Sequence, residues 1–98
     1  MPDLCNEIEK FGKGIGNTSR YRIVEALFHG PKTVGQLVKA VKLTQPAVSQ
    51  HLRTLKACNI VLDARHGQAV SYSLNNEYVL KLLKSLSSEL ARKGKKHS

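Results

Sequence analysis

The middle of the sequence has the pattern of two short amphipathic helices joined by a tight turn. Thr33 and Gln36 form a capping box, in which each side chain can accept a hydrogen bond from the other residue's backbone N–H. Thr44 is a second N-cap, and Pro46 stands in the first turn that follows it, where a proline fits a helix. Between the two caps, apolar residues recur at i, i+3, i+4 and i+7, namely Val34, Leu37, Val38 and Val41. This pattern predicts a helix-turn-helix.

The second helix of this pair, expected over residues 45–57, has an outer face without a carboxylate. Its apolar positions recur at i, i+4 and i+7, namely Val48, Leu52 and Leu55. Because each residue advances about 100° around a helix, the side chains that point away from the core are Pro46, Ser49, Gln50, Arg53 and Thr54. This face carries neither a negative charge nor a large apolar side chain, so it is suited to approach a polyanion.

After Cys58 the hydrophobic period changes to about two residues, which is typical of strands. We expect two strands, over Ile60–Arg65 and Ala69–Leu74, joined by a turn that contains Gly67. A hairpin that directly follows a helix-turn-helix is a wing. The predicted fold class is therefore mainly α with a β-hairpin wing (α+β), a winged helix-turn-helix with about five helices and a two-stranded wing.

Two further helices are expected before the helix-turn-helix. The first begins near Leu4 and runs into the segment GKGIG at 12–16, which we interpret as a linker or a frayed helix end, because no strand precedes it and a GK[ST] ending is missing. Asn17 can cap the second helix, and Gly30 followed by Pro31 ends it. The apolar stripe of this second helix consists of Ile23, Val24, Leu27 and Phe28.

A last helix is expected after Asn75 or Asn76, either of which can cap it. Its apolar stripe is longer than the core of one small domain needs, so we expect it to pair with the first helix of a second copy. The predicted dimer-interface residues are Leu4, Ile8, Phe11, Val79, Leu82, Leu83 and Leu86. The domain is predicted to cover residues 1–91, and residues 92–98 have the composition of a flexible basic tail.

The charge balance indicates the class of partner. The 98 residues include 16 Lys and Arg against 7 Asp and Glu, a formal net charge of +9, and the segment 26–62 contains bases but no acid. Such a chain favours nucleic acid as its partner first and an anionic membrane surface second. No apolar run reaches the roughly 18 residues that cross a bilayer, and the N-terminus lacks the pattern of a secretory signal. We therefore expect a soluble cytoplasmic protein of one domain.

The sequence resembles the ArsR (ArsR/SmtB-type) family of small winged-helix repressors in three runs, which are RYRIVEAL, TVGQLVKAVKLTQPAVSQHLRTLKACNIV and RHGQAVSYSL. The most specific part is TQPAVSQHL, at the start of the second helix of the pair. The resemblance implies a homodimer made by the first and last helices. It also implies that this dimer binds an imperfect inverted repeat in double-stranded DNA and represses transcription until a signal releases it.

The pattern of the family implies that four residues of the recognition helix face DNA, namely Gln45, Pro46, Ser49 and Gln50, with Arg53 nearby. It also implies DNA contacts by three wing residues, Arg65, His66 and Gln68. Together with the cap and the outward face of that helix, the predicted DNA-binding residues are Thr44, Gln45, Pro46, Ser49, Gln50, Arg53, Thr54, Arg65, His66 and Gln68. Glutamine can form a bidentate pair with adenine in the major groove, and two roles stay open for Arg53, a guanine edge or a phosphate. The wing residues fit phosphate or minor-groove contacts better than base readout.

The sequence departs from the family at its metal sites. Metal-sensing members carry a cysteine-rich cluster in the helix that here reads VGQLVKAVK, which has no thiol, carboxylate or imidazole. At the second metal site of the family, on the last helix, the corresponding residues are Asn76, Tyr78, Glu89 and Arg92, which do not suit zinc or nickel. We therefore expect no metal site and no other cofactor.

The two cysteines are too few and too far apart for a disulfide framework or a CxxC zinc site. A redox role stays open for Cys5 on the predicted dimer helix, whereas Cys58 is expected to be a small packed hydrophobe. Nothing in the sequence indicates an enzyme, since it lacks paired carboxylates or a nucleophile with a base. The predicted function is a sequence-specific, double-stranded DNA-binding transcriptional regulator; the alternative is a winged-helix module for non-specific nucleic-acid or protein-partner binding.

Overall fold

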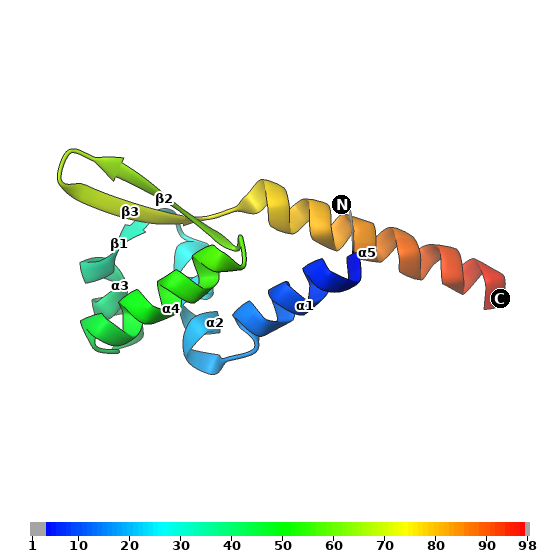
Figure 1. Cartoon of the computed structure of the whole chain (residues 1–98), viewed down its shortest axis with the longest axis horizontal. Coiled ribbons are helices and arrows are strands. Elements are labelled where there is room, and N and C mark those ends of the chain that lie inside the picture. The colour runs from blue at the N-terminus through cyan, green and yellow to red at the C-terminus, as the bar shows by residue number, and fades with distance from the viewer. Residues whose placement is uncertain (1–3, 98) are drawn as a thin grey trace.

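The structure, a computed structural model, describes the backbone of residues 4–97 and the side chains of residues 4–92. Its elements, in chain order, are α1 (Leu4–Ile15), α2 (Thr18–Leu27), β1 (Lys32–Thr33), α3 (Val34–Val41), α4 (Gln45–Ala57), β2 (Val61–His66), β3 (Ala69–Leu74) and α5 (Asn76–His97). Figure 1 shows α2, α3, α4 and the hairpin together at one end, while α5 runs away from them along the long axis of the molecule. The extents along the principal axes are 53, 26 and 22 Å. The predicted winged helix-turn-helix fold is confirmed.

The helix starts follow from the caps that the sequence predicts. The Asn17 side chain accepts a hydrogen bond from the N–H of Arg20 (3.1 Å) at the start of α2. At α3 both bonds of the capping box are present, at 3.2 Å and 2.9 Å between Thr33 and Gln36. The hydroxyl of Thr44 accepts from the N–H of Ala47 (3.3 Å) and begins α4. These side chains satisfy N–H groups that have no partner within the helix.

The hairpin belongs to a three-stranded antiparallel sheet in the order β1-β3-β2. The register of β2 against β3 runs from Val61 opposite Leu74 to His66 opposite Ala69, and Gly67 supplies the positive φ of the turn (+67°). The strand β1 was not predicted, because two residues are too few to show a period of two. It pairs Lys32 with Tyr72, so the base of the hairpin is tied to the segment that leads into α3.

The core lies between α2, α3, α4 and the base of the hairpin. Its fully buried side chains are Ile23, Leu37, Val48, Leu52, Leu55, Ile60 and Val61. They include Val48, Leu52 and Leu55, the apolar residues that the sequence assigned to the inner face of α4. The opposite face of α4 therefore points away from the core. None of the helices within residues 4–97 is long and apolar enough to cross a membrane.

The glycine-rich segment is helical, which corrects the prediction of a linker or a frayed end. The helix α1 continues through Gly12 and Gly14 to Ile15. Gly14 is buried against Ile60 and Cys58, and the guanidinium of Arg20 donates to the carbonyl oxygens of Gly14 (2.8 Å) and Lys13 (2.9 Å). The helix persists because its last carbonyls have a charged donor and its glycine allows a close approach to the core.

The last helix is longer than predicted and is partly covered within one chain. Asn75 is its cap, since the Asn75 side chain accepts from the N–H of Tyr78 (3.3 Å). The helix runs to His97, so it extends into the segment 92–98 that the sequence assigned to a flexible tail; Ser98 lies outside the described residues. The helix α1 of the same chain contacts α5, and Leu82 is fully buried there. The prediction that Leu82 faces a second copy is therefore corrected, because none of its surface is left to cover.

Candidate nucleic-acid interface

The outer face of α4 presents the residues predicted to contact DNA. Gln45, Pro46, Gln50 and Arg53 are exposed, and Ser49 is half-buried beside them. Between Gln50 and Arg53 the guanidinium donates to the amide oxygen of the glutamine (3.3 Å), so the two side chains orient each other. The free amide NH2 of Gln50 remains available as a donor, and guanidinium hydrogens of Arg53 remain for an external acceptor.

The two threonines of the predicted set have hydrogen bonds within the protein. The hydroxyl oxygen of Thr44 is the cap of α4, and the hydroxyl of Thr54 donates to the carbonyl oxygen of Gln50 (3.3 Å). Thr44 is exposed and Thr54 is half-buried. Both hydroxyls therefore contribute first to the position and local geometry of the helix that carries Gln50.

The wing carries its three predicted residues around the hairpin turn. Arg65 and His66 end β2, Gln68 follows the turn glycine, and all three are exposed. Figure 1 shows that this turn is the part of the hairpin farthest from α5 and that it projects beyond the helices. The structure thus brings the recognition-helix residues together on one surface and places the wing residues at a separate outer edge.

An ion pair that the sequence analysis missed joins the recognition helix to the wing. The ammonium of Lys56, in the last turn of α4, lies 2.9 Å from the Asp63 carboxylate on β2. This hydrogen bond lowers the pKa of Asp63 and raises the pKa of Lys56. One sequence signal pointed to it, since Asp63 is the only carboxylate between Glu25 and Glu77.

A hollow of about 350 Å³ separates α4 from the hairpin. It is named here the α4–hairpin crevice, and its lining residues are Ser49, Leu52, Arg53, Lys56, Asp63 and Tyr72. Besides Asp63, four of these residues carry polar or charged groups, namely Ser49, Arg53, Lys56 and Tyr72. Neither Lys56 nor Tyr72 was among the predicted DNA-binding residues.

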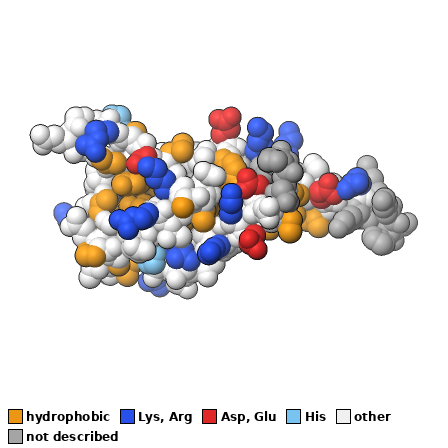
Figure 2. Space-filling view, in the orientation of Figure 1, with side chains coloured by type: hydrophobic (Ala, Val, Ile, Leu, Met, Phe, Trp, Pro, Cys, Tyr) orange, Lys and Arg blue, Asp and Glu red, His pale blue; other side chains and the backbone are white. Residues whose placement is uncertain are grey.

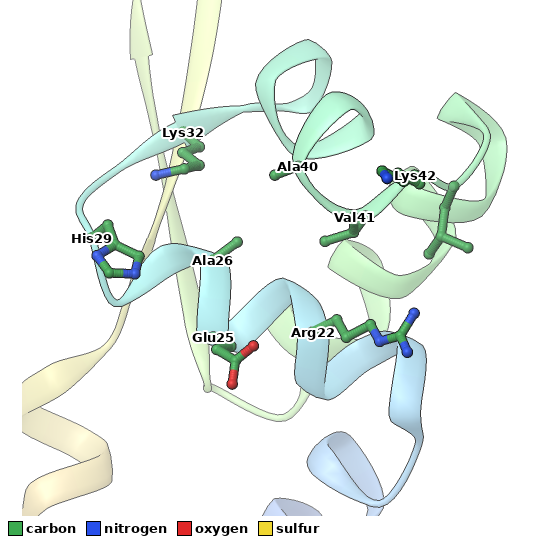
Figure 3. A pocket seen from close by; sticks show the side chains of 9 residues that line it. Arg22, Glu25, Ala26, His29, Lys32, Ala40, Val41 and Lys42 are labelled. Atoms are coloured by element: carbon green, nitrogen blue, oxygen red, sulfur yellow. The ribbon is translucent and has the colours of Figure 1, made fainter.

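A larger hollow, of about 530 Å³, lies on the other side of the helix-turn-helix, between α2 and the end of α3 (Figure 3). Its charged lining consists of Arg22 and Glu25 on α2, Lys32 on β1 and Lys42 after α3, with His29 at its edge. None of the residues that the sequence predicted to bind DNA lines it.

Four of the five cations of the acid-free segment 26–62 line these two hollows. Lys32 and Lys42 line the larger one, Arg53 and Lys56 line the α4–hairpin crevice, and Lys39 is exposed on α3. On the face seen in Figure 2, Lys and Arg side chains lie along the whole length of the molecule, whereas most carboxylates lie over α1 and α5. The end of the molecule that carries the predicted DNA-binding residues is therefore positive because it holds few carboxylates.

An apolar groove of about 340 Å³ runs between α1, α2 and α5. Phe11, Val79 and Leu83, which the sequence predicted to contact a second copy, line it together with Phe28 and Leu80. Leu80 (66%), Phe28 (60%) and Leu83 (44%) keep large exposed fractions in the single chain. The other predicted interface residues, Leu4, Ile8 and Leu86, are half-buried.

The cysteines and the last-helix residues that correspond to a family metal site are also placed. Cys58 is buried in the core and Cys5 is exposed, both as free thiols. Glu89 pairs with Arg92, while burial of the Tyr78 hydroxyl, with Glu7 beside it, raises the pKa of Tyr78. Among the described residues, no three His, Cys, Asp or Glu side chains lie close enough together to hold a metal ion.

Residues 17–62 match the family model described as "Bacterial regulatory protein, arsR family". The chain is 40% identical over 63 residues to the HTH-type transcriptional regulator Rv2034 of Mycobacterium tuberculosis. The aligned segment covers 64% of this chain and 59% of Rv2034. It is 35% identical to the transcriptional repressor SdpR of Bacillus subtilis, over 64% of this chain and 70% of SdpR. The chain thus spans less than two thirds of the length of Rv2034.

Among solved structures, the chain is similar to the homodimeric winged helix-turn-helix DNA-binding domain Mb0332 from Mycobacterium bovis. The two share 25% identity with a TM-score of 0.74, over 97% of this chain and 87% of that one. The likeness covers α1 and α5 as well as the central helices, since it extends over nearly the whole chain.

Proposed function

Since this chain belongs to the arsR family of bacterial regulatory proteins, we propose that it is a homodimeric, sequence-specific, double-stranded DNA-binding transcriptional regulator that acts as a repressor. The observation that carries this proposal is the outer face of α4. That face lacks any carboxylate and is exposed at Pro46, Gln50 and Arg53. It stands on a helix whose inner face is fully buried and whose start is capped. A rigid helix with such a face can enter the major groove without repulsion from the phosphates.

On this proposal, the first turns of α4 read the bases. Gln45 and Gln50 carry amides that can make bidentate pairs with adenine, and the Ser49 hydroxyl can donate or accept. The hydrogen bond from Arg53 orients the Gln50 amide and uses one lone pair of its oxygen, so the second lone pair and the NH2 group remain for the two bonds of an adenine pair. Arg65, His66 and Gln68 at the hairpin turn reach the adjacent minor groove or its phosphates.

The homodimer is proposed to form through the apolar groove and the exposed leucines of α5. Leu80, Leu83 and Leu90 expose 66%, 44% and 62% of their surfaces in the single chain, which is costly unless a partner covers them. A two-fold dimer would present two copies of α4 to successive major grooves of an inverted repeat. The relative Mb0332 is itself described as homodimeric.

We further propose that the protein acts in the cytoplasm, without enzymatic activity and without a bound metal. Two observations support this: the family is one of regulators, and at the positions of its last-helix metal site Glu89 pairs with Arg92 and the Tyr78 hydroxyl is buried. Inductively coupled plasma mass spectrometry of purified protein would test the metal proposal.

Fluorescence anisotropy tests the proposed function directly. The protein is titrated at physiological salt onto the duplex upstream of its own gene and onto a shuffled duplex of equal length. We expect at least about a thousandfold tighter binding to the first, which is the ratio typical of a specific regulator. Equal, salt-sensitive binding to both duplexes would replace this proposal by the alternative of a non-specific winged-helix module.

A further inference from the structure

We propose that the α4–hairpin crevice binds the sugar–phosphate backbone of DNA, with Lys56 as a phosphate ligand and Asp63 as an internal competitor for that lysine. This inference rests on the proposed function and extends it to residues outside the predicted recognition set. It gives a role to Asp63, the only carboxylate between Glu25 and Glu77.

The position of the crevice follows from how a winged helix fits B-DNA. When α4 lies in the major groove and the hairpin turn reaches the adjacent minor groove, one sugar–phosphate strand separates the two grooves. That strand must cross between the recognition helix and the hairpin. The crevice is the hollow at this place, and its volume of about 350 Å³ leaves room for a phosphate group and part of its sugar.

The donors that line the crevice suit a phosphate. Arg53 and Lys56, at i and i+3 along α4, both line the crevice, so they lie on the side of the helix that faces the hairpin. Tyr72 on β3, which carries a hydroxyl, lines the opposite wall. Hydroxyl, guanidinium and ammonium groups are the usual protein donors to phosphate oxygens.

The role of Asp63 follows from its contacts. Its carboxylate holds the Lys56 ammonium at 2.9 Å, and it lies directly opposite Tyr72 in the sheet register. A phosphate that enters the crevice meets the same ammonium and is repelled by the carboxylate. Asp63 therefore positions Lys56 in the free protein and weakens the general attraction for any DNA backbone, which favours discrimination by the α4 base contacts.

The salt dependence of DNA binding tests both roles. For the full chain we expect Lys56→Gln to weaken binding to the upstream and shuffled duplexes by similar factors. We also expect it to reduce the slope of log K against log salt by about 0.9, the value for one phosphate contact. Lys13→Gln is the control, because it removes the same charge from an exposed position on α1. Lys56→Arg should restore the slope.

The companion variant Asp63→Asn tests whether Asp63 competes with phosphate for Lys56 or only stabilises the fold through the ion pair. Loss of a competitor predicts tighter binding to both duplexes, so Asp63→Asn and Lys56→Gln should shift affinity in opposite directions. Two outcomes would overturn the crevice proposal while the wild type still binds DNA: both variants weaken binding, or Lys56→Gln keeps the wild-type slope of log K against log salt. In either case the proposed function stands. If the wild type binds neither duplex, the proposed function fails first and the crevice proposal fails with it.

Discussion

Gly14 on α1 lies so close to Ile60 that a Cβ atom built on the glycine would stand 2.4 Å from the Cδ1 atom of the isoleucine. The same Cβ would meet the Cβ of Cys58 at 3.4 Å. Both neighbours are buried, with exposed fractions of 1% for Ile60 and 7% for Cys58. The absence of a side chain at this position therefore sets how closely α1 packs on the core.

The first prediction concerns this contact. Gly14→Ala should lower the free energy of unfolding by about 1 kcal/mol, because the overpacking cost exceeds the gain of about 1 kcal/mol in helix propensity. Gly12→Ala is the matched control, since nothing lies within 4 Å of its Cβ position, and it should stabilise the protein by about 0.5–1 kcal/mol. Urea denaturation followed by circular dichroism measures both changes.

A double variant sharpens that test. Ile60→Val removes Cδ1, the atom that the new methyl group would meet, so Gly14→Ala should cost less in the Ile60→Val background than in the wild type. Additive costs would show that the two residues do not compete for the same space.

The second prediction concerns the end of α1. Arg20→Ala removes both hydrogen bonds to the carbonyl oxygens of Gly14 and Lys13, so it should destabilise the fold by about 1–2 kcal/mol, measured by denaturation. Arg22→Ala removes a like charge two residues later on the exposed side of α2 and should change stability by no more than about 0.5 kcal/mol. Equal losses in the two variants would contradict a specific role of Arg20.

The third prediction concerns base readout. Gln50→Ala should reduce the affinity ratio between the upstream and shuffled duplexes by about 5–150-fold, the equivalent of 1–3 kcal/mol for one bidentate pair, with the melting temperature unchanged. Arg65→Ala on the wing should instead weaken binding to both duplexes by the same factor. An unchanged ratio in Gln50→Ala, measured by anisotropy, would remove Gln50 from the readout set.

The fourth prediction concerns the dimer. Leu83→Lys places a charge in the apolar groove and should give monomers with weak DNA binding, as measured by sedimentation velocity. Leu62→Lys is the control, because Leu62 has a similar exposed fraction, 50% against 44%, but lies on β2. A stable Leu83→Lys dimer would place the interface on another surface.

The fifth prediction concerns pH. Because the Lys56 hydrogen bond lowers the pKa of Asp63 below its ordinary value of 3.8, the ion pair is formed at higher pH and is lost as the pH falls through the folded-state pKa. In Lys56→Gln the pKa of Asp63 should rise toward 3.8. Titration of the Asp63 carboxyl carbon by NMR measures the shift, and identical values in the two proteins would mean that the pair is open in solution.

The parts of the fold that depend on neighbours in sequence were predictable. The caps at Asn17, Thr33 and Thr44 each join residues three positions apart, and the spacing of Val48, Leu52 and Leu55 assigned both faces of α4. These are local hydrogen bonds and local periodicities, so the sequence carries them without the rest of the fold. The family resemblance then assigned the wing residues.

Other features required the tertiary structure, because each depends on segments that approach only after folding. The pairing of Lys32 with Tyr72 creates β1, and the packing of α1 on α5 buries Leu82 within one chain. The sequence by itself determined which helices form and which face of α4 is polar, since short-range hydrogen bonds and the helical period decide both. Only the tertiary structure decided that Lys56 meets Asp63 and that α1 remains helical through Gly14, because contacts across the fold decide where charges pair and where a glycine is needed.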